Sequence, residues 1–381
     1  MTDLVALGSV ALGRRLADPV RLAGSDRSVV LRCRSSSPSG QHAGSVVLKC
    51  YPADSAGRAS FAAEAAGLEF TTGTGAAPDL LAVDLAERLI VMTDLGDWPS
   101  LADLLLAPSA DQAREWLLNW ARACGELAVR TAGRRPEFAA LLAKYGAPPA
   151  SGVLDWLPRR IGEIPDLLTS LSFAVPDRLG DDLDQVIAGL LTPGPFEVFS
   201  PGDICPDNNL LTAGGVRFID FESADFHSVF LDAAYLRMPF STCWCVFALP
   251  VDLAGGAQTE YRKLVTGVLP ELADDELWSS GVRLATAAWT LHAMTYLLDR
   301  SVEGDASMNP DASQAPTKRQ LVRYRWRALA GELDRAAVLA EGGRPPRTPA
   351  ELPALRALLD QLLAKTDLWQ VPELPLYPAF R

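Results

Sequence analysis

A short stretch between residues 199 and 222 constrains the fold of this chain more than any other. Residues 209–212 predict a strand, residues 213–215 a glycine-containing turn, and residues 216–221 the return strand. Two adjacent glycines suit such a turn because glycine accepts positive φ at little cost. The predicted hairpin places Asn208 opposite Asp220 or its neighbour, and Asp203 lies on the loop that leads into it.

The side chains at the base of this hairpin suit metal and phosphate chemistry. An amide oxygen on Asn208 beside a carboxylate on Asp220 would make a hard oxygen site for Mg²⁺. A further carboxylate close by, on Asp203, could accept a proton from an attacking hydroxyl. Asp203 and Asp220 also form a carboxylate pair of the kind found in glycosidases, but the intervening Asn208 favours metal and phosphate.

A second pair of charged residues occurs earlier in the chain. Residues 58–70 predict a helix, and Glu64 lies on or beside its apolar face, between Phe61 and Leu68. A carboxylate there is costly unless it is paired, and Lys49, on the predicted strand 45–51, is the natural partner. The pair is either a simple ion pair at the sheet edge or a lysine held by a glutamate to clamp nucleotide phosphates.

The pattern along the chain changes after the first hundred residues. Residues 1–96 predict a small sheet, with strands at 28–33, 45–51 and 88–92, and one helix. Residues 97–381 are predicted to be mainly helical, apart from the hairpin. The strongest helical patterns, one of which carries Trp116 and Trp120 as expected core residues, cover residues 111–130, 258–269, 275–299, 318–340 and 348–368. The polar loop 301–316 is either a lid or an ordinary surface loop.

Composition excludes several classes of protein. The 381 residues are 49% hydrophobic and 22% charged, as expected of a folded chain, and the net charge of −12 disfavours a nucleic-acid partner. The acidity either attracts a cationic small molecule or only aids solubility. The six cysteines have no CxxC spacing and the three histidines are isolated, so we expect reduced thiols and no zinc site.

The sequence gives no sign of a membrane segment. The N-terminus lacks a basic region before an apolar run, and the apolar stretch 238–249 is too short to cross a bilayer and contains Pro239. We therefore expect a cytoplasmic protein, either a monomer or a homodimer, that does not associate with membranes.

The order of these features resembles the aminoglycoside phosphotransferase and choline kinase family, which has a protein-kinase-like fold. That family has a strand lysine, a helix glutamate, a connector, a helical region with H-G-D-x-x-x-x-N, and then I-D-[FWY]-E. The matching residues are 201–208 and 219–222; the resemblance is specific over 196–236 and moderate over 46–96. It implies an α+β, bilobal fold with a small β-rich N-lobe and a larger, mainly helical C-lobe.

The resemblance also implies a role for each matching residue. Asp203 would orient or deprotonate the acceptor hydroxyl, and Asn208 and Asp220 would hold Mg²⁺ against ATP or GTP. Asn208 is preferred to Asn209 because it keeps the four-residue gap after Asp203. The residues implied to bind the nucleotide are Lys49 with Glu64, Ser25 in the loop 24–28 over the phosphates, and Met92, Asp94 and Leu95 in the hinge that receives the base.

The resemblance further implies a small-molecule kinase whose acceptor is a hydroxyl of an antibiotic, a sugar or an amino alcohol. Carboxylates of Glu222 and Asp225, with the aromatic stretch 240–247, are candidates to line a site for a cationic acceptor. Glu222 is alternatively a second metal carboxylate or a surface residue. His227 either approaches the acceptor or is a surface or hydrogen-bonded histidine. Asp232 matches a family aspartate that braces the catalytic loop.

Two features depart from the family pattern. Pro201 stands where the family has a histidine that supports the catalytic loop, and the loop 24–28 has the single glycine Gly24. These departures keep an alternative open: a pseudokinase or nucleotide-binding regulatory module without turnover. The intact Asp203, Asn208 and Asp220 favour the kinase.

Overall fold

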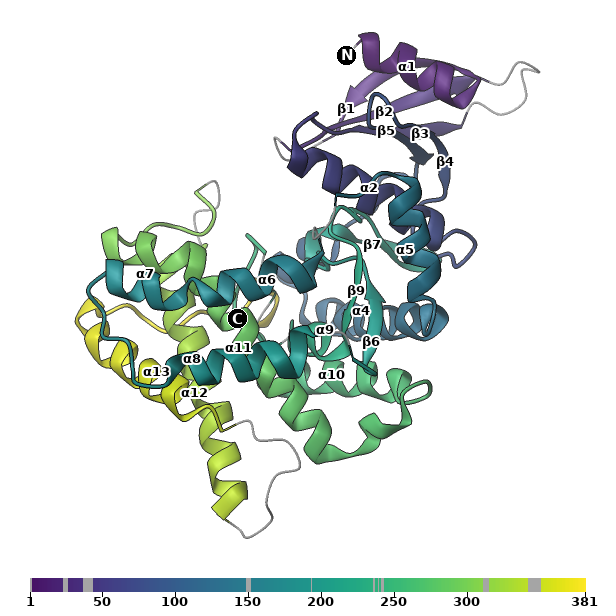
Figure 1. Ribbon diagram of the computed structural model, residues 1–381. Helices are drawn as coiled ribbons and strands as arrows, with labels where there is room; N and C mark the ends of the chain where they lie inside the picture. Colours follow the sequence, from purple (N-terminus) through teal and green to yellow (C-terminus); the bar gives the residue numbers. More distant parts are fainter. Residues whose placement is uncertain are drawn as a thin grey trace.

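A computed structural model describes residues 2–22, 27–36, 44–148, 152–192, 194–235, 237–238, 240, 243–310, 315–341 and 351–381. Its N-terminal part is a five-stranded antiparallel sheet in the order β1-β2-β3-β5-β4 (Figure 1). The strands are β1 (Arg15–Arg21), β2 (Val29–Ser36), β3 (Ser45–Cys50), β4 (Leu80–Asp84) and β5 (Leu89–Thr93). Helix α1 (Thr2–Leu12) precedes the sheet, and α2 (Ser55–Phe70) connects β3 to β4.

The sheet is covered by one helix on each face, as Figure 1 shows. Successive residues of a strand point to opposite faces. In β5, Leu89 and Val91 join the cluster that packs against α1, whereas Ile90 and Met92 join the core on the α2 side. Because Leu48 belongs to the α1 cluster, the next residue, Lys49, faces α2.

The sequence predicted part of this region and missed part of it. The helix predicted over 58–70 is present but begins at Ser55, because the Asp54 side chain caps it by accepting a hydrogen bond of 2.7 Å from the Gly57 N–H. Helix α1 and strands β1 and β4 were not predicted.

The rest of the chain is mostly helical. Its α-helices are α3 (Leu101–Leu106), α4 (Ala110–Thr131), α5 (Arg135–Lys144), α6 (Val153–Gly162), α7 (Ile164–Ser170), α8 (Leu179–Val186), α9 (Val229–Tyr235), α10 (Val251–Val265), α11 (Asp275–Glu303), α12 (Lys318–Glu341) and α13 (Pro353–Lys365). Short π and 3₁₀ turns are η1 (Ile187–Leu191), η2 (Pro206–Asn208), η3 (Pro270–Ala273), η4 (Asp367–Trp369) and η5 (Pro378–Phe380).

The long predicted helices all have counterparts, with shifted ends. The helix expected over 258–269 is α10, which begins seven residues earlier, and the last one begins at Pro353, while residues 348–350 lie outside the described part. The loop expected over 301–316 starts only after Glu303, where α11 ends, and its residues 311–314 also lie outside the described part.

Two small antiparallel ribbons interrupt the helices. Strands β6 (Glu197–Ser200) and β9 (Asp225–Ser228) form one, and β7 (Asn209–Thr212) and β8 (Gly215–Phe218) form the predicted hairpin. The hairpin pairs Thr212 with Gly215, so its loop has two residues instead of three, and the return strand ends at Phe218. In this register Asn208 lies opposite Ile219, one residue before Asp220, whereas the predicted registers placed it opposite Asp220 or Phe221.

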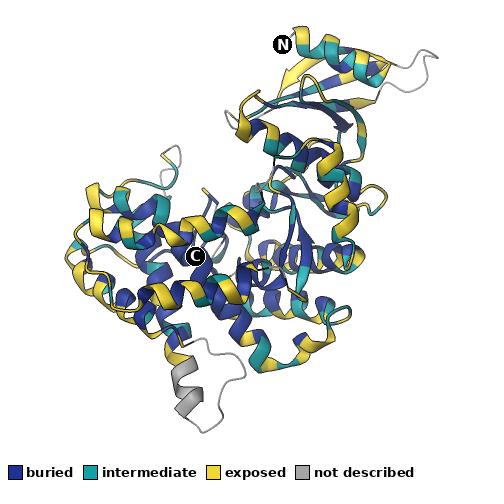
Figure 2. Ribbon diagram, in the orientation of Figure 1, coloured by how far each residue is buried: buried dark blue, intermediate teal, exposed yellow. Residues whose placement is uncertain are grey.

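One continuous core joins the sheet to the helices. It runs from Ile90 and Met92 through α2 to the helical region, where Trp120 is 2% exposed (Figure 2). At Gly67 of α2, a Cβ would lie 2.8 Å from the ring of Phe221, so α2 packs directly on the segment after the hairpin. Among the described residues, no helix combines the length and the apolar character needed to cross a membrane.

The architecture is therefore the expected α+β, bilobal one: a small β-rich N-lobe and a larger, mainly helical C-lobe. The boundary between residues 96 and 97 stays a prediction. After β5 the chain runs along the hairpin, where the Leu211 N–H donates to the Pro99 carbonyl, and α3 begins at its Ser100 cap.

Candidate active site

Three charged residues from distant parts of the chain meet at the junction of the lobes. The Lys49 Nζ of β3 lies 3.0 Å from Glu64 Oε2 of α2 and 2.5 Å from Asp220 Oδ1, which follows β8. The structure thus brings together the predicted lysine–glutamate pair and one predicted metal ligand. The pair is therefore not a peripheral one at the sheet edge, because Lys49 also contacts the hairpin of the C-lobe.

Lys49 and Glu64 are buried, and the charge of each shifts the pKa of the other. The side chains of Lys49 and Glu64 are 8% and 1% exposed, and the Tyr51 hydroxyl donates to Glu64 over 3.2 Å. Burial alone would lower the pKa of Lys49, but Glu64 and Asp220 outweigh it and raise that pKa above its ordinary value. Burial raises the pKa of Glu64 to about 7, an effect that Lys49 offsets only in part. The two carboxylates thus favour the charged form of the ammonium.

The backbone at the base of the hairpin positions Asn208 and Asp220. The Ile219 N–H donates to the Asn208 carbonyl over 3.0 Å, and the Asn208 amide nitrogen donates to the Asp203 carbonyl over 3.1 Å. Asp220 adopts the left-handed region, with φ of 65°, which aspartate tolerates better than most residues. Strained conformations of this kind cluster at functional sites.

The donor set fits Mg²⁺. The amide nitrogen of Asn208 is engaged by the Asp203 carbonyl, so the amide oxygen is the atom that this half-buried side chain could offer to a metal, together with the carboxylate of Asp220. Hard oxygen ligands of this type are those that Mg²⁺ prefers. Asn209 is fully buried and donates to the Ile204 carbonyl over 3.2 Å, so it supports the loop from within. The metal assignment of Asn208 and Asp220 itself stays a prediction.

Asp203 lies on the same loop as Asn208. Its carboxylate accepts a hydrogen bond of 3.4 Å from the Cys205 N–H and is half-buried. Burial raises the pKa of Asp203, and the nearby charges of Asp220 and Asp207 raise it further. A carboxylate with a raised pKa is a better proton acceptor than an ordinary one.

Glu222 is buried beside the cluster and is not a surface residue. It is 7% exposed, and burial and the charge of Asp220 raise its pKa. Arg27 forms an ion pair with Glu222 over 2.5 Å and so links the loop before β2 to the C-lobe. No local sequence pattern indicated this pair, because the two residues are 195 positions apart. Ser25, the predicted phosphate-loop contact, lies outside the described residues.

The predicted hinge is tied to the sheet. The Asp94 carboxylate accepts hydrogen bonds from Ser45 at 2.5 Å and from the Gly96 N–H at 3.0 Å, and it pairs with Arg32 at 2.8 Å. Burial alone would raise the pKa of Asp94, but these contacts hold it below its ordinary value.

The neighbouring hinge residues have different surroundings. The Leu95 carbonyl accepts a hydrogen bond of 2.8 Å from the Trp98 indole, and Met92 is 6% exposed. The Asp94 side chain and the Leu95 carbonyl therefore already hold the hinge in shape. Binding of a base by other backbone groups of this segment stays a prediction.

A group that we call the Asp232 brace (Ser200, His227 and Asp232) supports the loop 201–208. The Ser200 hydroxyl donates to Asp232 Oδ1 over 3.1 Å, and His227 Nε2 lies 2.9 Å from the same oxygen. The His227 side chain is 3% exposed, so it is the hydrogen-bonded histidine and not an acceptor-side one. Because β9 pairs with β6, with His227 opposite Val198, His227 and Ser200 reach Asp232 from neighbouring strands of one ribbon.

Gly202 allows the loop 201–208 to pack closely on the segment after the hairpin. Its φ is 84°, and a Cβ there would lie 2.0 Å from the Ser223 carbonyl oxygen. Only glycine permits this approach, which brings the loop 201–208 against the segment that follows Asp220.

The candidate acceptor residues separate into two kinds. Phe240 and Phe247 are 0% and 4% exposed and belong to the core, whereas Trp244 is 44% exposed and donates to Asp207 Oδ2 over 2.7 Å. The Asp225 carboxylate accepts from the Phe226 N–H over 2.7 Å and lies against Gly152 at the start of α6, so it is partly used in holding that helix.

Comparisons with known proteins give information on the fold only. No protein-family model and no curated sequence matches the chain. Among solved structures, a candidate aminoglycoside phosphotransferase from Ralstonia eutropha is similar at 13% identity and a TM-score of 0.50, with 95% of this chain and 98% of that chain covered.

Two further solved structures are similar at lower TM-scores. A candidate fructosamine-3-kinase from Thermobifida fusca has 19% identity and a TM-score of 0.49, with 89% of this chain and 100% of that chain covered. A choline kinase from Cryptosporidium parvum has 12% identity and a TM-score of 0.49, with 86% and 91% covered.

The likeness to the Ralstonia structure shows that the chain has the protein-kinase-like fold, as its sequence motifs predicted. It establishes no more than the fold. The reaction has to be argued from the residues that the fold brings together.

Proposed function

We propose that the protein is a small-molecule kinase that transfers the γ-phosphoryl group of ATP or GTP to a hydroxyl group. One observation carries this proposal: Lys49, Glu64 and Asp220 meet across the lobes, next to a loop that presents Asp203 and Asn208. Phosphoryl transfer needs charge neutralisation and in-line positioning more than covalent help, and these residues supply both.

Each residue has a defined part in the proposed reaction. The Lys49 ammonium is kept charged by its carboxylate partners. When the nucleotide binds, this ammonium would move away from Asp220 and contact the phosphates. Mg²⁺ held by Asn208 and Asp220 would neutralise phosphate charge. The acceptor oxygen bonds to the γ-phosphorus as the bond to the β–γ bridging oxygen breaks, and the hydroxyl proton passes to the Asp203 carboxylate.

Pro201 does not weaken the proposal. The family histidine supports the catalytic loop, and here the Asp232 brace gives this loop a support from His227 and Ser200. Residue 201 is a proline, but a histidine of β9, the strand paired with β6, contributes to this support. This support favours an active kinase over a nucleotide-binding module without turnover.

The charge of the site suggests the class of acceptor. Glu222 is a carboxylate near Asp203 and Asp220, and the whole chain carries a net charge of −12. Such a field attracts cations. We propose a cationic acceptor that bears hydroxyls, an aminoglycoside-type antibiotic first and then an amino alcohol or amino sugar, phosphorylated in the cytoplasm.

The test is nucleotide consumption against a panel of antibiotics, sugars and amino alcohols, with mass spectrometry of the products. With a cognate acceptor, Asp203→Ala should lose about 10²–10⁴ in turnover, the usual contribution of proton transfer, and still bind Mg²⁺–ATP. Full turnover by Asp203→Ala would remove the role given to Asp203. Nucleotide binding without any product across the panel would favour the regulatory module instead.

A further inference from the structure

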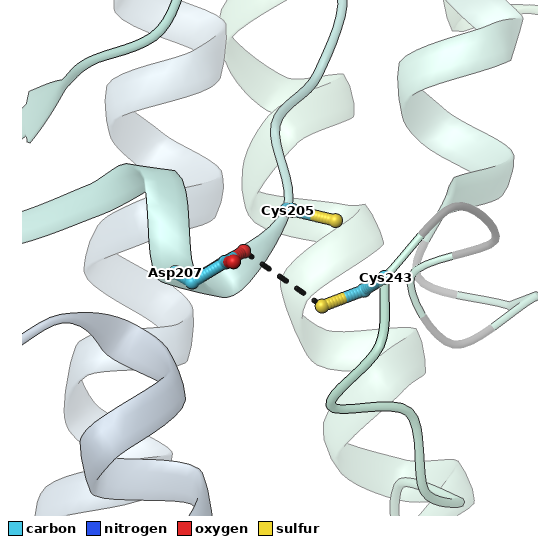
Figure 3. A group of neighbouring side chains, drawn as sticks. All are labelled: Cys205, Asp207 and Cys243. Carbon is cyan, nitrogen blue, oxygen red and sulfur yellow. Dashed lines mark hydrogen bonds between the residues drawn. The ribbon is translucent and has the colours of Figure 1, made fainter. Parts of the chain in front are cut away.

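Sulfur atoms and a carboxylate lie together on one side of the loop 201–208. Cys205 and Asp207 come from this loop, and Cys243 comes from the segment before α10 (Figure 3). Their ligand atoms all lie within 4.8 Å of one another, and Cys243 Sγ is 3.8 Å from Asp207 Oδ1. Cys245 adds another thiol, with its sulfur 2.7 Å from that of Cys243.

The cluster is shielded and its carboxylate is oriented. Cys205, Cys243 and Cys245 are 4%, 2% and 1% exposed. The Trp244 indole donates to Asp207 Oδ2 over 2.7 Å, while Oδ1 of the same carboxylate points towards Cys243. Outer contacts of this kind fix the direction of metal-binding carboxylates in proteins.

From this geometry we propose that Cys205, Asp207 and Cys243 form a site for a thiophilic divalent cation of the Zn²⁺ class. Zn²⁺ binds thiolates and carboxylates in tetrahedral sites, at about 2.3 Å and about 2.0–2.2 Å. Those bond lengths give a sulfur–oxygen edge of about 3.5 Å, close to the 3.8 Å between Cys243 and Asp207.

The site is distinct from the proposed Mg²⁺ site in its chemistry. Soft thiolates select Zn²⁺ and related ions, whereas the oxygen ligands of Asn208 and Asp220 suit Mg²⁺. Burial raises the pKa of the Cys205 and Cys243 thiols well above the ordinary value, so both are neutral without a metal. Binding therefore releases one proton to solvent for each thiol that becomes a ligand.

The proposed site departs from the expectation of no zinc site. That expectation rested on isolated histidines and on cysteines without CxxC spacing, but the fold brings Cys205 close to Cys243, which is 38 positions away. Because η2 contains both Asp207 and Asn208, a cation here would also hold the backbone that presents Asn208.

The experiment is an optical titration of the reduced, metal-stripped full chain with Co²⁺, which reports thiolate ligands by a near-ultraviolet charge-transfer band. We expect one equivalent of Co²⁺ to give the band and Zn²⁺ to displace it. Cys243→Ser should abolish the band. Cys50→Ser is the matched control, because it removes a half-buried thiol in β3 and should leave the band unchanged.

Absence of the band in the unaltered chain, or an equal band in Cys243→Ser, would overturn the proposal. If Cys243→Ser does not fold, Asp207→Asn takes its place, because it keeps the shape of the side chain. Asp207→Asn should weaken Co²⁺ binding at least tenfold, and unchanged affinity would count against the site. The readout needs no nucleotide, so it is independent of the proposed kinase activity.

Discussion

The cluster around Lys49 and the Asp232 brace both fix the hairpin and its loop, but by different means. In the cluster, one ammonium is surrounded by the carboxylates of Glu64, Asp220 and Glu222, drawn from both lobes. In the brace, one carboxylate receives the Ser200 hydroxyl and His227 from adjoining strands.

The two regions also differ in how they follow the family pattern. The cluster has the residue types that the resemblance implies, whereas residue 201 is a proline and the brace contains a histidine from another strand, His227. A residue that must offer charge or hard oxygen to a ligand is restricted in type. A residue that only holds backbone in place can be exchanged for another that reaches the same acceptor.

The largest effect should come from removing the ammonium of the cluster. Lys49→Met leaves Glu64 as a buried carboxylate without its partner, and breaking a buried ion pair costs about 3–5 kcal/mol. We expect this loss in the free energy of unfolding, measured in urea, together with loss of nucleotide binding. Lys144→Met is the control, since Lys144 pairs with Glu69 at the surface and should contribute at most about 1 kcal/mol. If the two variants lost the same free energy of unfolding, the buried pair of Lys49 and Glu64 would contribute no more than a surface ion pair.

A smaller effect should come from the brace. His227→Ala removes a buried contact to a charged group, and such hydrogen bonds contribute about 1.5–3 kcal/mol. We expect this loss in stability and a fall in kcat, because the loop that carries Asp203 loses its support, while the affinity for Mg²⁺–nucleotide stays unchanged. A variant that lost nucleotide affinity and kept kcat would contradict the role of a brace. Ser200→Ala should show the same pattern at about 1 kcal/mol.

The smallest effect is the pH dependence of the brace. Burial alone would lower the pKa of His227, but Asp232 outweighs it and raises that pKa above the ordinary value. The stabilisation is therefore complete below the unfolded pKa of about 6.5 and is lost as the pH rises through the folded pKa. The difference in unfolding free energy between the unaltered chain and His227→Gln should be larger at pH 6 than at pH 9. A constant difference would show that His227 is neutral in the fold.

How far the sequence predicts these two regions depends on the range of the interactions. The hairpin was predictable because a glycine turn and alternating strands are local signals, and Lys49 and Glu64 because an acidic residue on an apolar helix face needs a partner. The exact register of the hairpin was not predictable, because it depends on whether the turn contains two residues or three, that is, on whether Gly215 pairs with Thr212.

The remaining features depend on contacts that no local pattern encodes. The ion pair of Arg27 with Glu222 and the approach of Cys205 to Cys243 arise only when distant elements pack. Helix α1 was missed because it is stabilised by the outer face of a sheet whose edge strand β1 is mostly exposed and weakly patterned. The position of His227 beside Asp232 follows from the β6–β9 pairing, which the sequence did not predict.

The central claim is that Asp220, held by Lys49 and next to Asn208, joins a metal ion to a nucleotide. Calorimetric titration of the chain with ATP and with GTP, each with Mg²⁺ and with EDTA, tests it directly. We predict binding of at least one nucleotide that requires Mg²⁺ and is lost in Asp220→Asn, with the melting curve of the variant still cooperative. Nucleotide binding that persists in EDTA, or that Asp220→Asn leaves unchanged, would contradict the account.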